Sequence, residues 1–143
     1  MRVSSTNLLY PPFLIEMNVG LDRARKAGFE MYPFETYRSY ARQNELYMQG
    51  RATPGKIVTN AKPRDSWHHY GLAMDVARKV DGKWNWEFDP FEISKFFAGL
   101  QVTWGGSKDG PHYQWKHLLP IEKSKSIVEE AGVLGLWSIL EAR

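Results

Sequence analysis

The chain contains no cysteine among its 143 residues, which excludes disulfide bonds, thiolate zinc sites and cysteine nucleophiles. Any metal ion must therefore be bound through histidine, aspartate or glutamate side chains. Histidine is scarce as well, because only positions 68, 69, 112 and 117 carry it, so the possible metal sites are few. No apolar run approaches the roughly 18 residues that a membrane-spanning helix needs, and we expect no stable membrane insertion.

Long runs of one charge are absent too. The formal net charge is +3, with 19 Lys and Arg residues spread along the chain against 16 Asp and Glu residues. This mild excess favours anionic partners without selecting one of them. Scattered charge, with no motif that interleaves aromatic and basic residues, argues against a nucleic-acid-binding protein.

The overall composition is that of an ordinary globular protein. It is 43% hydrophobic and 24% charged, which is enough apolar material to fill a core. A chain of this length is about the size of one domain, and two full cores would not fit. We therefore expect a single domain over residues 1–143, and a monomer.

Proline, glycine and capping residues divide the chain into helices and short strands. Pro11-Pro12 is typical of a helix start and Gly28 of a helix end. Ser39 is suited to cap a second helix, and Asp81-Gly82 predicts a hairpin turn. The expected helices are 11–28, 40–49, 90–99 and 120–140, the last broken at Gly132 and Gly135, and the expected strands are 29–37, 71–80, 83–88, 102–104 and 112–115.

The order of these elements predicts the fold class. Helices and short strands are mixed, the hairpin implies antiparallel pairing, and the spacing of strand–helix–strand units with parallel strands is missing. We therefore expect an α+β fold in which helices flank a small antiparallel sheet.

Two segments carry the residues that suggest chemistry. The first, 66–75, reads SWHHYGLAMD and contains His68 and Asp75; the second, 109–112, reads DGPH. Its Gly-Pro pair forbids a helix, so Asp109 lies in a turn and His112 begins a strand. Two imidazoles and one carboxylate can hold zinc with the fourth position open for water, and a further carboxylate nearby can accept a proton. From these residues alone, ordinary partly buried histidines and an ion-paired aspartate remain an alternative.

The spacing of His68 and Asp75 sets a geometric condition on such a site. In one straight strand, residues seven apart point to opposite faces, because seven is odd. The two can share a metal only if His68 lies before the strand or if the chain bends between them. Gly71 is where a bend is expected.

The first segment resembles a known family. Ser66, His68, Gly71, Ala73 and Asp75 match the S-x-H-x-x-G-x-A-x-D signature of the D-alanyl-D-alanine peptidase/L-alanyl-D-glutamate endopeptidase family, the VanY-like zinc peptidases. Five fixed positions in ten arise by chance in on the order of one chain in ten thousand. Three more segments are similar to family motifs: Tyr37-Arg38-Ser39 followed by Gln43, the endolysin-type Trp104-Gly105-Gly106, and Asp109-x-x-His112.

The resemblance implies a fold like that of the hedgehog signalling domain and the D-Ala-D-Ala peptidases. It implies that His68, Asp75 and His112 bind Zn²⁺. It also implies that Asp109 is the general base, which takes a proton from the attacking water and passes it to the leaving amine.

The resemblance further implies which residues contact the substrate. Arg38 would stabilise the oxyanion or hold a substrate carboxylate, because a guanidinium is always charged and binds such groups with two donors. Gln43 and Ser66 would give neutral hydrogen bonds to the peptide. The chain departs from the pattern at Gln114, where many relatives have an acidic residue, and in the short segment between Trp104 and Asp109.

The activity implied by the resemblance is zinc-dependent hydrolysis of peptidoglycan stem peptides. The Trp-Gly-Gly segment favours the L-alanyl-D-glutamate endopeptidases of phage endolysins. A D-alanyl-D-alanine carboxypeptidase is the alternative, and a non-catalytic zinc-containing wall-binding module is a third, against which Asp109 argues. The N-terminus does not resemble a secretory signal, so we expect a lysin that waits in the host cytoplasm and then acts on the periplasmic cell wall. A bacterial enzyme would instead be periplasmic or secreted.

Overall fold

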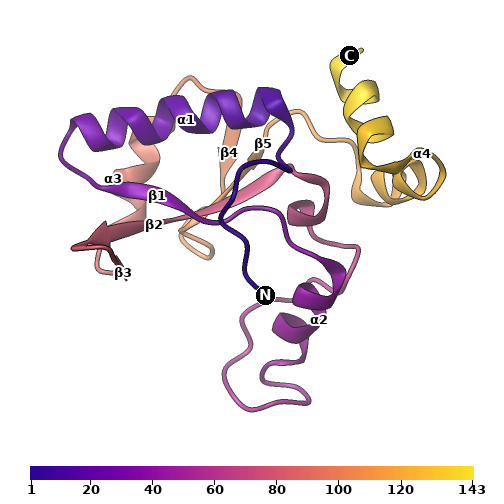
Figure 1. Cartoon of the computed structure of the whole chain (residues 1–143), viewed down its shortest axis with the longest axis horizontal. Helices are drawn as coiled ribbons and strands as arrows, with labels where there is room; N and C mark the ends of the chain where they lie inside the picture. The colour runs from indigo at the N-terminus through magenta and orange to yellow at the C-terminus, as the bar shows by residue number, and fades with distance from the viewer.

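The structure is a computed structural model that describes residues 1–143. It is built on a five-stranded antiparallel sheet with the order β1-β2-β5-β4, in which β3 pairs with the far end of β2 (Figure 1). The strands are β1 (Met31–Glu35), β2 (Ala73–Val80), β3 (Lys83–Asn85), β4 (Val102–Trp104) and β5 (His112–Trp115). The helices are α1 (Pro11–Lys26), α2 (Tyr40–Met48), α3 (Pro90–Ser94) and α4 (Ile121–Glu141), with short 3-10 turns η1 (Trp67–Tyr70) and η2 (Lys95–Phe97). The expected α+β class is confirmed.

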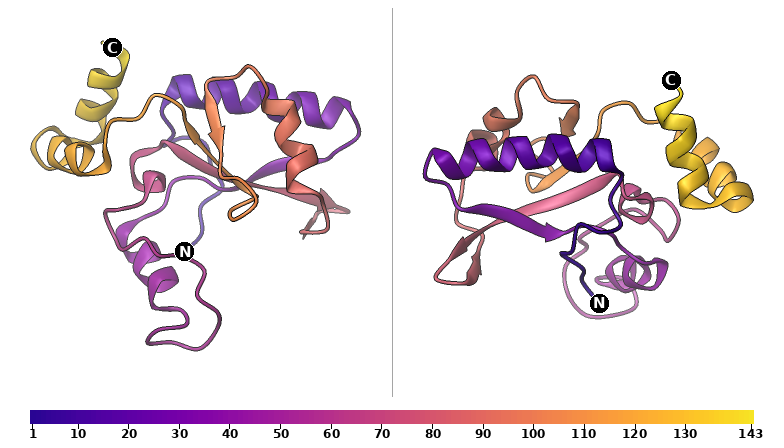
Figure 2. Two further views of the ribbon diagram at one scale, coloured as in Figure 1. Left: turned by 180° about the vertical axis from the view of Figure 1, so that it is seen from behind. Right: turned by 45° about the horizontal axis from the view of Figure 1, so that its top comes forward.

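The two faces of the sheet are covered by different elements. Helix α1 covers one face, whereas α2 and the long loop after it lie on the other side of the sheet (Figures 1 and 2). Because side chains alternate along a strand, Met74 and Val76 of β2 point toward α1 and Asp75 points away from it. The core therefore forms between α1 and the sheet and leaves the opposite face for polar residues. Its members on α1 are Phe13, Met17, Leu21 and Ala24.

Several expected boundaries differ from the structure. The strands expected over 71–80 and 83–88 span Ala73–Val80 and Lys83–Asn85, and the helix expected over 11–28 ends at Lys26. The first strand spans 31–35 rather than 29–37, and a register shift between Pro33 and Glu35 interrupts its regular pairing with β2. The helix expected over 90–99 is divided into α3 and η2. In α4 the break occurs at Gly132, which has a φ of 73°, whereas Gly135 remains helical. A glycine inside a helix costs only about 1 kcal/mol, so its presence alone does not end the helix.

Helix α4 lies at one end of the sheet, and it is held there by aromatic side chains. The indole nitrogen of Trp137 donates to the carbonyl oxygen of Tyr70 at 2.7 Å, and its ring packs 5.7 Å from that of Tyr10. Leu136 and Leu140 are buried. No helix in the structure is both long and apolar enough to cross a membrane.

Gly71 joins three segments at one point, and replacing it tests this packing. Its φ is +70°, and a Cβ there would lie 2.5 Å from the carbonyl oxygen of Leu8 and 2.8 Å from the ring of Trp137. We expect Gly71→Ala to lower the free energy of unfolding by about 3 kcal/mol, from left-handed backbone strain plus the steric clash. Urea denaturation measures the change.

Gly82→Ala is the matched control, because Gly82 has a φ of +74° with nothing within 4 Å of the added carbon. It should cost only the backbone strain, about 1 kcal/mol. If both variants lose the same free energy of unfolding, the close contacts of Gly71 with Leu8 and Trp137 do not limit the residue at that position.

Candidate active site

Strand pairing aligns three titratable side chains in a row. Asp75 on β2 lies directly opposite His112 on β5 and opposite Glu35 on β1. Residues directly opposite in an antiparallel pair project to the same face, so all three side chains lie on the face away from α1. The register shift between Pro33 and Glu35 puts Glu35 in this row.

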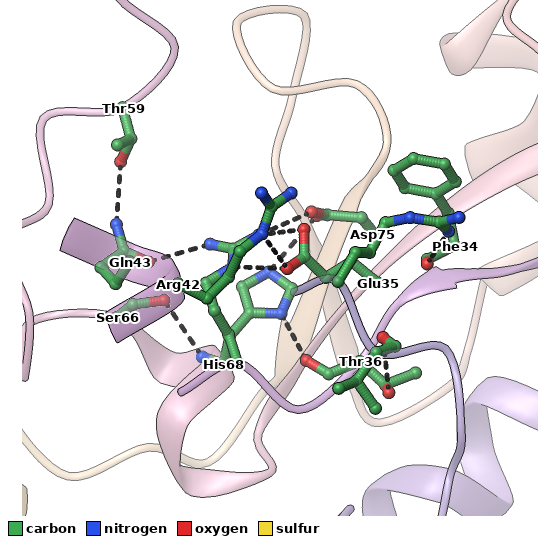
Figure 3. Close-up of polar contacts among 12 residues, drawn as sticks. Phe34, Glu35, Thr36, Arg42, Gln43, Thr59, Ser66, His68 and Asp75 are labelled. Atoms are coloured by element: carbon green, nitrogen blue, oxygen red, sulfur yellow. Dashed lines mark hydrogen bonds and ion pairs between the residues drawn. The ribbon is translucent and has the colours of Figure 1, made fainter. Parts of the chain in front are cut away.

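His68 joins the row from a turn before the strand. Ser66 caps η1 by accepting a hydrogen bond from the backbone N–H of His68 at 3.2 Å, and Gly71 ends the turn in a left-handed conformation. The chain therefore reverses before β2 begins, which meets the condition set by the odd spacing. The Nε2 atom of His68 lies 3.4 Å from Oδ1 of Asp75 (Figure 3).

The three side chains meet in a geometry suited to one metal ion. One ligand atom each from His68, Asp75 and His112 lies within 4.8 Å of the others. The Nδ1 atom of His112 is 3.2 Å from Oδ1 of Asp75. His68 is buried, and the other two are partly buried.

Outer hydrogen bonds fix which ring nitrogen of each histidine faces the site. Nδ1 of His68 donates to the carbonyl oxygen of Thr36 at 2.8 Å, which leaves the lone pair of Nε2 toward Asp75. Nε2 of His112 donates to Oε1 of Gln114 at 2.8 Å, which leaves Nδ1 facing Asp75. Metal-binding histidines are commonly held in this way. The amide of Gln114, where the chain departs from the expected family pattern, therefore makes the outer hydrogen bond.

The charges favour cation binding. Burial would raise the pKa of Asp75, but His68 and His112 together lower the pKa by more than burial raises it. The pKa of Asp75 therefore lies well below its usual range. Burial would lower the pKa of His112, but its hydrogen bonds to Asp75 and Gln114 and the charges of Asp75 and Asp109 together outweigh burial, and the net pKa is raised. An ionised carboxylate thus lies between two imidazoles, and a metal ion would displace the proton of His112.

Glu35 binds two arginines in a buried cluster. Arg38 donates to both of its carboxylate oxygens, at 3.1 and 3.0 Å, and Nε of Arg42 donates to Oε2 at 3.1 Å. Burial would raise the pKa of Glu35, but the hydrogen bonds from the two guanidinium groups outweigh it, and the pKa is lowered. Arg38 also donates to Oδ2 of Asp75 at 3.3 Å, so the cluster directly supports the candidate ligand.

Gln43 lies in this cluster and not on the cleft wall. It is fully buried; Oε1 accepts from Nη1 of Arg38 at 3.0 Å, and Nε2 donates to the carbonyl oxygen of Ala61 at 2.7 Å. Nε2 of Gln43 also lies 3.5 Å from the hydroxyl of Thr59, and Figure 3 shows this second link between helix α2 and the long loop. This differs from the expectation that Gln43 contacts the peptide, because both ends of its amide are already bonded within the protein.

Asp109 lies beside the row, in the turn that precedes β5. Its Oδ2 is 3.9 Å from Nδ1 of His112, and its side chain is 61% exposed. Partial burial raises the pKa of Asp109, and the charge of Asp75 adds to this. Gly105 makes the tight turn possible, because a Cβ there would lie 2.4 Å from the carbonyl oxygen of Asp109.

Most of the polar side chains described above open onto one cleft of about 540 Å³, which Gln43 and Gln114 do not line. Arg38, Ser66, His68, Asp75, Asp109 and His112 line it together with Glu35 and Arg42. Apolar side chains form part of the remaining wall, among them Phe34 and Trp86 near β3 and Leu46 and Val58 near α2, and Gln49, Thr59 and Asp65 also line it. The structure thus brings together the expected ligands, Asp109, Arg38 and Ser66.

The sequence reasoning missed Glu35 and Arg42. The only local signal was a carboxylate at the end of a predicted strand with arginines three and seven residues later. That spacing does not reveal burial, which depends on pairing with β2, far away in sequence. His69 and His117 stay outside the row, as expected from their lack of partner spacing.

Glu35→Gln tests whether the buried cluster stabilises the fold. Removing the charge leaves two guanidinium groups without their counter-ion, and we expect a loss of about 3–5 kcal/mol in the free energy of unfolding near pH 7. Because the pKa of folded Glu35 lies below its ordinary value, the wild type loses this stabilisation as the pH falls below about 4.5. The difference in the free energy of unfolding between wild type and variant should therefore become smaller at acid pH.

Urea denaturation from about pH 7 down to about pH 3 measures this gap. Glu30→Gln is the control, because Glu30 is exposed and bonds only to the hydroxyl of Tyr32. A gap that stays constant with pH would contradict the account.

Comparison with known proteins identifies the family. The family model VanY, described as D-alanyl-D-alanine carboxypeptidase, matches residues 16–103. The peptidoglycan L-alanyl-D-glutamate endopeptidase CwlK of Bacillus subtilis is 38% identical over 106 residues, which cover 64% of each chain. The match thus spans just under two thirds of this relative's length.

Two solved structures share the fold. The L-Ala D-Glu endopeptidase ChiX of Serratia marcescens has a TM-score of 0.57 and 26% identity, over 80% of this chain and 90% of its own. A variant of the vancomycin resistance D,D-pentapeptidase VanY, in complex with Zn(II), has a TM-score of 0.51 and 16% identity over 95% of this chain and 88% of its own. From the extent of the family match and the shared fold, the chain belongs to the VanY family.

Proposed function

We propose that this chain is a zinc-dependent peptidoglycan peptidase that hydrolyses the L-alanyl-D-glutamate bond of cell-wall stem peptides. The observation that carries the proposal is the meeting of three ligand atoms, from two histidines and one aspartate, within 4.8 Å beside a second, separate carboxylate, that of Asp109, in one cleft. The choice of bond is supported by CwlK and ChiX, both of which are L-alanyl-D-glutamate endopeptidases. We propose that residues 1–143 act as one peptidase domain, as a monomer.

The donor set fits zinc. Two neutral imidazoles and a carboxylate, with the outer nitrogens of both rings already hydrogen-bonded, are a common zinc-binding arrangement that leaves one position open. Zinc held there by His68, Asp75 and His112 would supply Lewis acidity, which lowers the pKa of water and polarises a peptide carbonyl.

The residues of the chain then have separate roles. Asp109 takes a proton from the attacking water and returns it to the leaving amine, for which its partly exposed carboxylate beside His112 is well placed. Arg38 holds Asp75 in position through its hydrogen bond to Oδ2. Ser66 lies on the cleft wall, and its hydroxyl proton remains available to a peptide carbonyl.

A D-alanyl-D-alanine carboxypeptidase is the second candidate, and the description of the matching family model favours it. The two activities use the same metal site and differ in the bond that the cleft presents to it. The experiment is digestion of purified Gram-negative peptidoglycan, with and without a chelator and with zinc added back, followed by mass analysis of the fragments. Chelator-sensitive cleavage after L-alanine supports the endopeptidase, whereas release of terminal D-alanine supports the second candidate.

No cleavage despite bound zinc would instead favour a non-catalytic zinc-containing wall-binding module. The place of action follows from the substrate, which is the bacterial cell wall. The endolysin-type segment Trp104-Gly105-Gly106 supports a phage lysin that leaves the host cytoplasm, as the alternative to an enzyme that its own bacterium exports.

Asp109→Ala separates catalysis from metal binding. Removing the base leaves all three ligands in place, so we expect zinc content to stay unchanged while kcat falls by about 10²- to 10⁴-fold. His68→Ala is the comparison, because it removes a ligand and should lose both zinc and turnover. Metal analysis and peptide hydrolysis are measured on the same preparations. Near-normal turnover by Asp109→Ala would contradict the assigned role.

Gln114→Leu tests the outer hydrogen bond of His112. Losing the acceptor for Nε2 frees the ring, and we expect zinc affinity to fall by about 10- to 100-fold in competition with a chelator. Gln101→Leu is a matched control, because Gln101 accepts from Nε2 of His117 in the same way on the exposed surface. If both variants keep wild-type affinity, the orientation of His112 does not depend on Gln114.

A further inference from the structure

The two arginines bound to Glu35 are used differently. Arg38 is buried, and its Nε, Nη1 and Nη2 atoms all donate to side chains of the protein, namely Glu35, Gln43 and Asp75. The guanidinium of Arg38 thus makes its hydrogen bonds within the fold, although it also lines the cleft. The expected contact of Arg38 with the oxyanion or a substrate carboxylate stays a prediction.

Most of the N–H donors of the Arg42 side chain make no hydrogen bond within the protein. Only its Nε atom makes a hydrogen bond, to Glu35 at 3.1 Å, and its nearest other acidic partner is the exposed Glu45, 3.8 Å from Nη1. Its side chain is 22% exposed, and it lines the cleft. Most of the N–H groups of its guanidinium are thus available on the wall of the site.

The charge balance leaves Arg42 without full compensation. Arg42 shares the single charge of Glu35 with Arg38, which also pairs with Asp75, and the other carboxylate near Arg42 is that of the exposed Glu45 at 3.8 Å. Asp65, another acidic residue on the cleft, is paired with Lys125 at 2.8 Å. Phe34, Trp86 and Val58 line the same cleft, and apolar walls strengthen the attraction between a guanidinium and an anion.

We propose that Arg42 binds a carboxylate of the substrate next to the scissile bond and thereby determines specificity. The inference rests on the proposed function. In a stem peptide in which D-glutamate is linked through its side chain, cleavage after L-alanine leaves the free α-carboxylate of D-glutamate on the leaving side. Arg42 and Arg38 donate to the same carboxylate, that of Glu35, and Arg38 also donates to Asp75. An anion bound to Arg42 is therefore close to the metal ligands. Arg38 is a positioning residue.

The test compares two synthetic stem peptides, one with the free α-carboxylate of D-glutamate and one with the α-amide in its place. We expect wild-type kcat/KM to favour the carboxylate by about 10- to 100-fold, mainly through KM, because hydrogen bonds to charged groups are the strong ones. Arg42→Gln should lose this preference, and Arg42→Lys should keep part of it.

Lys108→Gln is the control for general electrostatic attraction, because Lys108 is exposed in the turn before Asp109 and removing it also deletes one positive charge near the cleft. It should keep the wild-type preference. A preference that survives in Arg42→Gln, or that falls equally in Lys108→Gln, overturns the proposal. So does a wild type that cleaves both peptides equally well, a result that leaves the proposed function intact.

Binding separates the inference from turnover. Titration calorimetry in the Asp109→Ala background measures affinity for the two peptides, with and without Arg42→Gln. If the carboxylate peptide binds more tightly than the amide peptide, and this difference disappears in Arg42→Gln, the result supports the proposed role of Arg42. Failure of the wild type to cleave either peptide would overturn the proposed function, and the calorimetric difference would still decide whether Arg42 binds the carboxylate.

Discussion

The candidate site depends on the position of Asp75 in the middle of the sheet. Its pairing with His112 on one side and Glu35 on the other places a carboxylate between a histidine ligand and an arginine cluster. A shift of one residue in the register would turn Asp75 into the core against α1 and bring Met74 to the cleft. The apolar packing of Met74 and Val76 under α1 therefore also fixes the geometry of the polar face.

Burying the cluster of Glu35, Arg38 and Arg42 to support the side chain of Asp75 has a large cost in desolvation free energy. Removing Glu35 and its arginines from water costs several kcal/mol, and this is offset only because nearly every polar atom of Arg38 and Gln43 has a partner. What the cluster achieves is a connection: it links β1, α2, the loop that contains Ala61 and the ligand strand β2. A protein that needs only stability would gain more from apolar packing at the same position.

Much of this arrangement could be predicted from the sequence. Local signals identified α1, α2, the hairpin after β2 and the bend at Gly71, because caps, prolines and glycines act within a few residues. The residues that meet at the site were suggested by motif. The environment of Gln43 and the burial of Glu35 could not be predicted, because both follow from the register shift in β1 and from contacts with a distant loop. The contrast between the non-helical Gly132 and the helical Gly135 shows that glycine alone does not fix where a helix breaks.

The central claim is that one zinc ion is held by His68, Asp75 and His112 in an arrangement that the fold sets in advance. The most direct measurement is anomalous diffraction at the zinc edge from crystals of the zinc-loaded protein. The account predicts one strong peak, bonded to Nε2 of His68, a carboxylate oxygen of Asp75 and Nδ1 of His112, with Glu35 and Arg38 unmoved. Zinc bound elsewhere, or bound to His112 through Nε2 with Gln114 displaced, would contradict it.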